Sequence, residues 1–365
     1  MKLFVELQMP DWVYWNRHFP DGVGRSVFSS PQWQTLLESE QPPGSKLMVL
    51  RAEQPDGRRL TLPVFVQEGR WGRKEMMMLP VGYPVLPIEE GPLLCECALP
   101  AILRQGEALA SAQLTWWLPP WCGWRSLASS DRGRCACERS GVSPWCAHLR
   151  TEFAEARWNG RREYTSNEIY VIEVQANLEE HLATQVRRQQ RQHLRASHRN
   201  GIEVVDSPSD ALIEQYIALY ERVHAERRWT GEPFSRGFFH RAARSLRRGG
   251  NLVVMRHDGR VVGGGIMLFD RYAVHLFHAL TDRDTPGVYP TAVLYALALE
   301  RAVERGLHYV NLGGINEGNA GLDRFKRQWG AKIVKAPMVH WRSTRRMLAR
   351  GVLSLGRSRT VLSTL

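Results

Sequence analysis

The residues best suited to chemistry lie in one glycine-rich stretch near the end of the chain, NLGGINEGNAGLDRFKRQWG, from Asn311 to Gly330. Four glycines in its first eleven residues allow backbone N–H groups to approach a ligand closely. Lys326 follows them and carries the charge needed to stabilise a developing oxyanion or to bind a phosphate. The alternative interpretation is a strand-to-helix turn in which Phe325 and Trp329 pack in the core and Lys326 is solvated.

The elements before this stretch must position it. Three consecutive strands are expected at 252–256, 260–269 and 272–281, joined by tight turns into an antiparallel meander. The run Gly263-Gly264-Gly265 inside the middle strand indicates a bulge or a close backbone approach. A helix that opens at Pro290 and stops at Gly306 then leads into a short strand, 309–312, which enters the glycine-rich stretch.

The rest of the second half alternates between helices and strands. A long basic helix over 179–200 is expected to end at Gly201, the usual position for a C-terminal glycine. The other expected elements are strands at 168–174, 202–206 and 333–341 and helices at 208–227 and 234–249.

The first half offers strands and helices in mixed order. Ser30-Pro31 is expected to cap a short helix over 32–37. A hairpin of strands 46–52 and 59–67 follows, and the remaining expected elements are a strand at 75–80, a helix at 99–112 and a strand at 113–118. The pattern then dissolves, so we expect a mixed α/β fold with an N-terminal unit at 1–165, a C-terminal unit at 166–342 and a basic tail at 343–365.

The chain has 365 residues and a net charge of +12 that is unevenly distributed. No acidic residue follows Asp323, and a second acid-free run, 181–202, carries five arginines. This concentration points to a polyanionic partner: RNA, an anionic membrane face or a phosphorylated substrate. The alternative is a solvated charged surface.

The six cysteines fall within 95–146, but their two Cys-x-Cys pairs do not have the spacing of structural zinc sites. We therefore expect reduced thiols and no metal. No apolar run approaches the length of a membrane span, and the N-terminus lacks the apolar core of an export signal, so a cytoplasmic location is expected.

The second half resembles the Fem-type nonribosomal peptidyltransferases (the FemABX group) and the related BioF2-like GNAT acyltransferases. Three features carry this resemblance over 165–340: the arginine-rich helix ending at Gly201, the helix and strand that lead into YVNLGG, and the stretch GLDRFKRQWG. The resemblance implies two GNAT-like units, each a mainly antiparallel sheet flanked by helices.

The resemblance also implies an activity. Fem-type members transfer an amino acid from aminoacyl-tRNA to an amine of a peptidoglycan precursor, forming an amide, and their functional lysine corresponds here to Lys326 beside Phe325. The chain is therefore expected to use aminoacyl-tRNA as donor, with no tightly bound cofactor. The alternatives are an acyl-CoA-dependent N-acyltransferase and a non-catalytic RNA- or membrane-binding protein.

Further candidate residues are weighed against packing roles. His278 titrates near neutrality and is a candidate general base, and it should face away from His275, three positions earlier on the same strand. Tyr289, at the entrance of the 290–305 helix, could donate a proton to the leaving group. Trp229 could stack on a base. The donor-binding candidates are completed by Arg187, Arg191, Arg195, Gly287, Asn311 and Asn316, although asparagine beside a glycine loop is usually turn chemistry.

The donor question depends on the segment RDTPGVYP, 283–290. A CoA-binding loop presents backbone amides to a pyrophosphate through two closely spaced small residues. Here Gly287 is present, but Tyr289 replaces the second small residue, and Pro286 and Pro290 lack N–H groups. The arginine excess favours tRNA. The tail, 343–365, is either a weak amphipathic helix at the inner membrane face, near a lipid-linked acceptor, or a frayed terminus.

Overall fold

The computed structural model describes residues 4–10, 27, 30–41, 44–53, 59–68, 74–77, 113–117, 160–227, 233–246, 249–269, 273–282, 284–314 and 320–343. Contacts divide the chain into two units. The first comprises Met1–Asp11, Gln41–Asn167 and Ala336–Leu365, and the second comprises Trp12–Glu40 and Glu168–Lys335. The expected unit boundary near 165 therefore lies close to a division at 167/168, but a segment of the first half and the end of the chain change sides.

The first unit contains a four-stranded antiparallel sheet in its described part. The order is β1-β2-β3-β4, built from β1 (Phe4–Gln8), β2 (Lys46–Glu53), β3 (Arg59–Glu68) and β4 (Lys74–Met77). The expected hairpin is thus confirmed as β2 and β3. A further strand, β5 (Gln113–Trp117), pairs antiparallel with the end of β12 (Lys332–Ser343).

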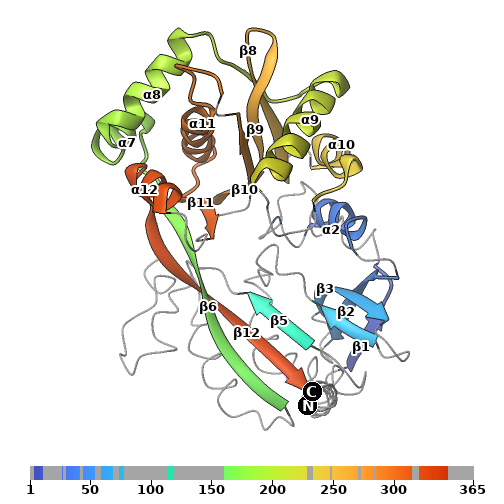
Figure 1. Ribbon diagram of the computed structural model, residues 1–365. Helices are drawn as coiled ribbons and strands as arrows, with labels where there is room; N and C mark the ends of the chain where they lie inside the picture. The colour runs from blue at the N-terminus through green and yellow to red at the C-terminus, as the bar shows by residue number, and fades with distance from the viewer. Residues whose placement is uncertain are drawn as a thin grey trace, which may run out of the picture. The chain divides into compact units, whose positions relative to one another are not determined.

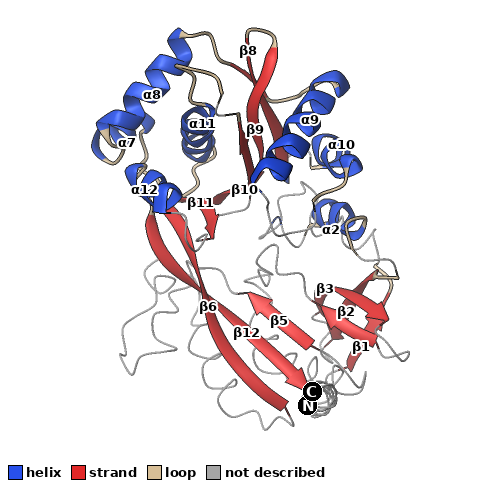
Figure 2. Cartoon of the chain, in the orientation of Figure 1, coloured by secondary structure: helices blue, strands red, loops and turns tan. Residues whose placement is uncertain are grey.

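The second unit is organised on one sheet with the order β12-β6-β11-β10-β9-β8-β7 (Figures 1 and 2). All its paired neighbours with a defined register are antiparallel except β10 and β11, which are parallel. The strands are β6 (Gly160–Glu173), β7 (Glu203–Val205), β8 (Gly250–His257), β9 (Arg260–Phe269), β10 (Ala273–Thr281) and β11 (Tyr309–Gly314). The expected meander is confirmed as β8, β9 and β10.

Helices cover both faces of this sheet. Figure 1 shows one group, formed by α7, α8, α11 and α12, on one side, and α2, α9 and α10 on the other. The first group is α7 (Leu178–Thr184), α8 (Arg188–Arg199), α11 (Pro290–Glu304) and α12 (Ala320–Gln328); the second is α2 (Pro31–Glu38), α9 (Asp210–Arg227) and α10 (Arg236–Ser245). The Ser30 hydroxyl caps α2 by accepting from the Trp33 amide, as the Ser-Pro pair predicts.

The three glycines of β9 are required by close packing on both faces. A Cβ at Gly264 would lie 2.8 Å from the Tyr216 ring of α9 and 2.3 Å from the Val253 carbonyl. A Cβ at Gly265 would lie 3.0 Å from Leu294 of α11 and 2.4 Å from the His278 carbonyl oxygen. The close approach expected from the glycine run is therefore confirmed.

The long basic helix expected over 179–200 is broken, and this expectation was wrong in part. Arg187, at the N-cap position of α8, is extended, with φ −61° and ψ 145°, and its amide donates to the Gln328 carbonyl of α12 at 2.8 Å. The Arg191 guanidinium donates to the carbonyls of Leu182, Ala183 and Val186 around the end of α7. A tertiary contact and a side-chain cap thus interrupt a segment whose local pattern is continuously helical.

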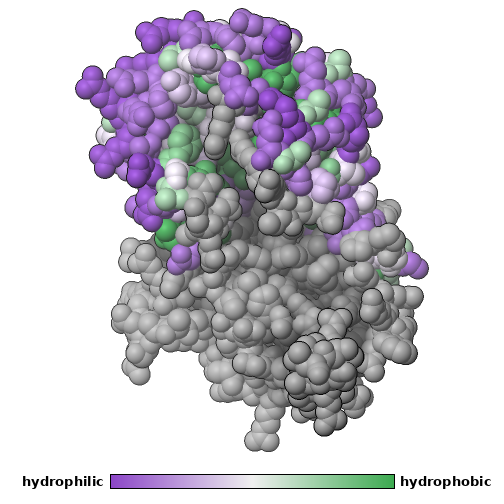
Figure 3. Space-filling model, viewed as in Figure 1, coloured by the Kyte–Doolittle hydropathy of each residue, from purple (hydrophilic) through white to green (hydrophobic). Residues whose placement is uncertain are grey.

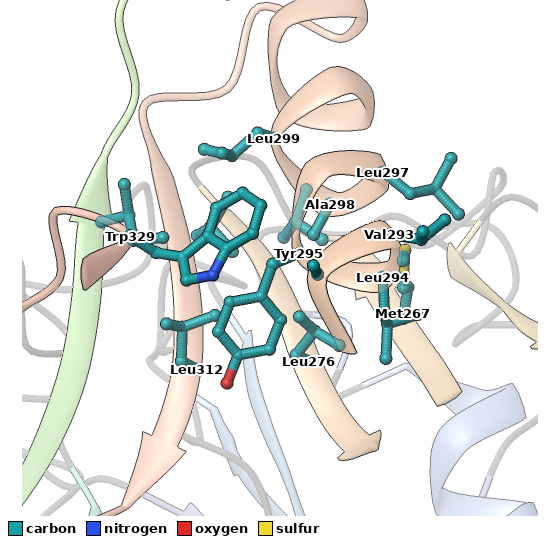
Figure 4. Packing of buried hydrophobic residues seen from close by; sticks show 14 of the residues in the cluster. Met267, Leu276, Val293, Leu294, Tyr295, Leu297, Ala298, Leu299, Leu312 and Trp329 are labelled. Atoms are coloured by element: carbon teal, nitrogen blue, oxygen red, sulfur yellow. The ribbon is translucent and has the colours of Figure 1, made fainter. Parts of the chain in front are cut away.

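The core of the second unit lies between the sheet and the α11 side. Trp329 is fully buried and packs edge-on against Tyr295 of α11, with ring centroids 5.6 Å apart (Figure 4). Tyr295 also contacts Phe325 of α12 at 5.3 Å. These aromatic contacts fix α12 against α11, and with it the position of Lys326 between Phe325 and Trp329 in the sequence.

Candidate functional site

Lys326 of α12 is buried beside the end of β11, with 4% of its surface exposed. Its Nζ donates to the Gly314 carbonyl at 2.9 Å and lies 4.7 Å from the centroid of the Tyr170 ring. Burial lowers the pKa of Lys326 from 10.5 to about 8. The alternative of a solvated lysine is therefore wrong, whereas the companion expectation that Trp329 is a core anchor is confirmed.

The buried lysine is held by an acidic and aromatic neighbourhood. The Tyr170 hydroxyl donates to Oδ1 of Asp323, which also accepts from Nε of Arg327 at 2.9 Å. Burial, followed by this bond to Asp323, raises the pKa of Tyr170, while the bond from Tyr170 lowers the pKa of Asp323. The ammonium thus faces an aromatic ring and a carbonyl oxygen, and the carboxylate on the same helix keeps its charge.

The strand ends beside this lysine diverge. Parallel pairing between β10 and β11 covers only Ala273–His275 and Tyr309–Asn311, and each strand is irregular directly afterwards. Asn311 shapes the turn, because its Oδ1 accepts from the Gly313 amide at 2.9 Å and its Nδ2 lies 3.1 Å from Nδ1 of His275. Asn311 therefore performs turn chemistry here, and the backbone that follows it carries the carbonyl bound by Lys326.

The two histidines of β10 lie on the same face of the sheet, and the expectation that they face opposite ways was wrong. The register of β10 with β9 shifts between Leu276 and His278, so Phe277 is an inserted residue. One extra residue restores the side of a position three places later. His278 accordingly lies with Tyr216 of α9, on the face opposite to Lys326.

The environment of His278 sets its protonation state. The Tyr216 hydroxyl lies 2.9 Å from Nδ1 of His278, and the rings of Tyr220 and Phe239 surround the imidazole. Burial lowers the pKa of His278 from 6.5 to about 4. The ring is therefore neutral at pH 7. It lies with residues of α9 and not beside Lys326.

This burial predicts an acid-sensitive fold. Because the unfolded chain binds a proton at His278 more readily, the free energy of unfolding should fall by at most about 3 kcal/mol as the pH drops from 6.5 to 4. His278→Gln should reduce this loss in urea unfolding at pH 7 and pH 4.5. The matched change at exposed His198 should leave the loss unchanged; an unaltered acid dependence in His278→Gln would contradict the assignment.

Two backbone amides at the start of α11 already have partners within the protein. The Tyr289 amide donates to the Ser197 hydroxyl of α8 at 2.8 Å, and the Val288 amide donates to the Thr285 carbonyl at 3.4 Å. Pro286 and Pro290 have no N–H, and the Gly287 carbonyl accepts from the Asn200 side chain at 2.9 Å. The end of α8 thus covers the turn that the sequence analysis examined as a phosphate-binding loop.

The arginine candidates separate into two kinds. Arg191 is half-buried, and its guanidinium donates hydrogen bonds to carbonyls at the end of α7. Arg187 and Arg195 are exposed. Phe325 packs on Tyr295 beside the buried lysine. Tyr289 stacks face to face on His193 of α8, with centroids 3.8 Å apart.

Other expectations lie outside the described residues: Trp229, Asn316, the helix at 99–112, the six cysteines and the tail beyond Ser343. Among the described residues, no group of histidine, cysteine or carboxylate side chains is arranged to hold a metal ion. The described helices include none long and apolar enough to cross a membrane.

Comparison with known protein families finds a match within the second unit. The model of the acetyltransferase (GNAT) domain matches residues 182–327, which run from α7 to α12 and include Lys326. The second unit therefore contains a GNAT-like domain. In its described part the parallel, diverging pair β10 and β11 and the connecting helix α11 form the centre of that domain.

The fold of the chain is also found in solved structures. The structure of FemX has a TM-score of 0.64 at 10% identity, covering 92% of this chain and 96% of that one. A conserved protein of unknown function from Bacteroides thetaiotaomicron has a TM-score of 0.54 at 14% identity, covering 92% and 99%. L-PGS from Bacillus licheniformis has a TM-score of 0.53 at 12% identity, covering 95% and 96%. No curated protein matches the chain by sequence.

These likenesses confirm the expected Fem-type GNAT fold. Sequence reasoning missed residues that contact the site but lie far from the glycine-rich stretch in the sequence. Tyr170 lies more than 150 positions before its partner Asp323, and Ser197 is one polar residue in a basic helix. Neither belongs to a local motif, so no spacing signal indicates them.

Proposed function

We propose that this protein is an aminoacyltransferase that moves an aminoacyl group from aminoacyl-tRNA to an amine of a peptidoglycan precursor or a peptide, forming an amide. The proposal rests on two features of the GNAT-like domain: the burial of Lys326 and the hydrogen bonding at the start of α11. The buried, chargeable Lys326 of α12 donates to the Gly314 carbonyl at the end of β11, while the Tyr289 amide at the start of α11, where a CoA pyrophosphate would bind, donates to Ser197 of α8.

Lys326 suits the electrostatic part of this reaction. The attacking amine forms a C–N bond to the ester carbonyl, the C–O bond to the ribose breaks, and the amine proton passes to the departing oxygen. The carbonyl oxygen becomes negative in between, and a protonated lysine in a water-poor site stabilises such a charge strongly. With a pKa of about 8, Lys326 is mostly protonated at pH 7 and still bears a loosely held proton.

The covered turn supports a donor other than acyl-CoA. A pyrophosphate binds at a helix N-terminus through free backbone amides. Within 285–292, two positions are proline, and the amides of Val288, Tyr289 and Ala292 are occupied inside the protein. The Fem-type fold and the exposed arginines of α8 favour a polyanionic donor held by side chains instead.

Two alternatives remain open to test. An acyl-CoA-dependent N-acyltransferase is favoured by the description of the matched domain as an acetyltransferase. A non-catalytic RNA- or membrane-binding protein would need the arginines but not Lys326. The expected cytoplasmic location, with a lipid-linked acceptor at the inner membrane face, belongs to the same proposal.

Ligand-dependent thermal stability separates these possibilities. Aminoacyl-tRNA should raise the melting temperature of the protein, and should do so less at higher salt because phosphate contacts release counterions. CoA and acetyl-CoA should leave it unchanged at millimolar concentration. Stabilisation by acetyl-CoA, with none by charged tRNA, would contradict the aminoacyl-tRNA donor and support the acyl-CoA alternative.

A further inference from the structure

Lys326 differs from the other charged side chains of the second unit. Most described residues on the face drawn in Figure 3 are hydrophilic, as expected where charged groups meet water. Lys326 is the one lysine among the described residues that is buried. A buried ammonium loses its hydration, and burial lowers the pKa of Lys326 to about 8. Its charge near neutral pH therefore depends on the groups that surround it.

Asp323 supplies a negative charge close to this lysine. It lies three positions earlier on α12, so the two side chains are neighbours on one face of the helix. Burial lowers the pKa of Lys326, and the charge of Asp323 opposes that effect. Hydrogen bonds from Tyr170 and Arg327 lower the pKa of Asp323, and the charge of Lys326 lowers it further. The carboxylate is therefore ionised at neutral pH.

Tyr170 of β6 contacts both members of this pair. The centroid of its ring lies 4.7 Å from Nζ of Lys326, and its hydroxyl donates to Oδ1 of Asp323. Tyr170 is buried on a strand, whereas the Asp323 side chain is 39% exposed on the helix. A carboxylate with that exposure could turn into water, where solvent would screen its charge. The bond from Tyr170 holds the carboxylate within the cluster instead.

The other polar groups around this cluster do not supply a second negative charge to the lysine. Arg327 donates to the same carboxylate oxygen at 2.9 Å. Burial and the bond to the carboxylate raise the pKa of Tyr170, Arg327 opposes this rise, and Glu168 of β6 adds to it. From β11 the lysine meets the carbonyl of Gly314, and burial raises the pKa of Tyr295 of α11, which stays neutral. The carboxylate is thus the one charge among the described residues that opposes the effect of burial on the pKa of the lysine.

We propose that Asp323 and Tyr170 are positioning residues for the transfer reaction: the Asp323 carboxylate keeps Lys326 protonated, and the Tyr170 hydroxyl holds that carboxylate beside the lysine. This inference rests on the proposed function and names the two residues on which its charged lysine depends. The alternative is a purely structural tie between β6 and α12. Such a tie would affect the stability of the fold but not the protonation of Lys326.

The test is an NMR titration of Lys326 in the full-length protein, made with lysine labelled with ¹³C at Cε. The signal of this carbon moves when the ammonium loses its proton. The spectrum is simple, because the chain has six lysines, Lys2, Lys46, Lys74, Lys326, Lys332 and Lys335. Lys326→Met identifies one signal by its loss, and the others report whether each variant is folded. The wild-type midpoint should lie near pH 8.

Two substitutions of nearly unchanged shape probe the cluster. Asp323→Asn removes the charge but keeps an oxygen that accepts from Tyr170, and it should lower the Lys326 midpoint by about half a pH unit or more. Tyr170→Phe keeps the ring but releases the carboxylate, so the midpoint should fall by less. In the double variant the fall should equal that of Asp323→Asn alone, because Tyr170 acts through Asp323.

Asp258→Asn is the matched control for the loss of charge. Asp258 is an exposed residue in the β8–β9 turn, and its φ of 47° suits asparagine. The Lys326 midpoint should be the same in this variant as in the wild type.

The pH profile of amide formation separates positioning from a structural role. At pH 8, Asp323→Asn should be about 2-fold slower than the wild type, because a smaller fraction of its Lys326 is protonated. At pH 6.5 the two rates should be nearly equal, because Lys326 is charged in both proteins. A structural defect would instead lower the rate at both pH values.

An unchanged midpoint in Asp323→Asn, or additive shifts in the double variant, would overturn the proposal. The titration needs no substrate, so it is independent of amide formation. If the midpoint moves as expected but no amide forms with charged tRNA, the proposed function fails and the coupling of Asp323 to Lys326 stands. If amide forms but the midpoint does not move, this inference fails and the proposed function stands.

Discussion

Replacement of Lys326 by methionine is expected to lower the rate of amide formation by about 100-fold or more while leaving the fold at least as stable as the wild type. The rate should fall because a charged donor for the developing oxyanion is lost. The stability should be retained because methionine fills the same buried space without a charge, and Lys326 is 4% exposed. Initial rates with charged tRNA and urea unfolding at pH 7 measure the two effects.

The lowered pKa of Lys326 also predicts how the stability of the fold changes with pH. Burial holds the pKa of Lys326 at about 8 in the folded protein, against 10.5 ordinarily. Between these values the unfolded chain binds more protons than the folded one, so wild-type stability should gain from this group as the pH rises from 8 to 10.5. The methionine variant should lack that gain.

Lys332→Met is the matched control, because Lys332 is exposed on β12 and should tolerate the change in both assays. Turnover of Lys326→Met close to that of the wild type would remove Lys326 from the mechanism. A variant that loses both activity and stability would instead indicate a structural lysine.

The second large effect is expected at Gly264, where alanine should destabilise the second unit by about 2 kcal/mol or more. The new Cβ would lie 2.3 Å from a backbone carbonyl and 2.8 Å from the buried Tyr216 ring, and neither can move without displacing β8 or α9. Urea unfolding measures the loss.

Gly314→Ala is the control for that substitution, because the nearest atom to its new Cβ would be the Glu168 carbonyl at 3.8 Å, an ordinary contact. It should change the free energy of unfolding by less than about 1 kcal/mol. Equal destabilisation at the two positions would show that the close approach of α9 to β9 is not what excludes a side chain.

Much of the second unit could be predicted from sequence, because its signals are local. Alternating apolar residues and tight turns indicate β8, β9 and β10, and Pro290 and Gly306 mark the limits of α11. The site could be predicted only as far as Lys326 and its neighbours in one glycine-rich stretch. The burial of Lys326 depends on tertiary contacts, in which Phe325 and Trp329 pack on Tyr295.

The remainder depends on partners far apart in the chain. The break between α7 and α8 arises from a bond between Arg187 and Gln328, which helical periodicity at 179–200 cannot reveal. The facing of His278 depends on one inserted residue in β10, and an inserted residue leaves no mark in a run of apolar and aromatic side chains. The hydrogen bond from the Tyr289 amide to the Ser197 hydroxyl is likewise a contact between elements.

The central claim, transfer of an aminoacyl group from tRNA to an amine, is tested most directly by mass spectrometry of candidate acceptors. Peptidoglycan-precursor peptides and simple peptides with free amines would be incubated with the protein and either charged tRNA or acetyl-CoA, with Lys326→Met in parallel. The account predicts an acceptor heavier by one amino-acid residue with charged tRNA, little with Lys326→Met and none with acetyl-CoA. An acetylated acceptor formed from acetyl-CoA, with no product from charged tRNA, would contradict it.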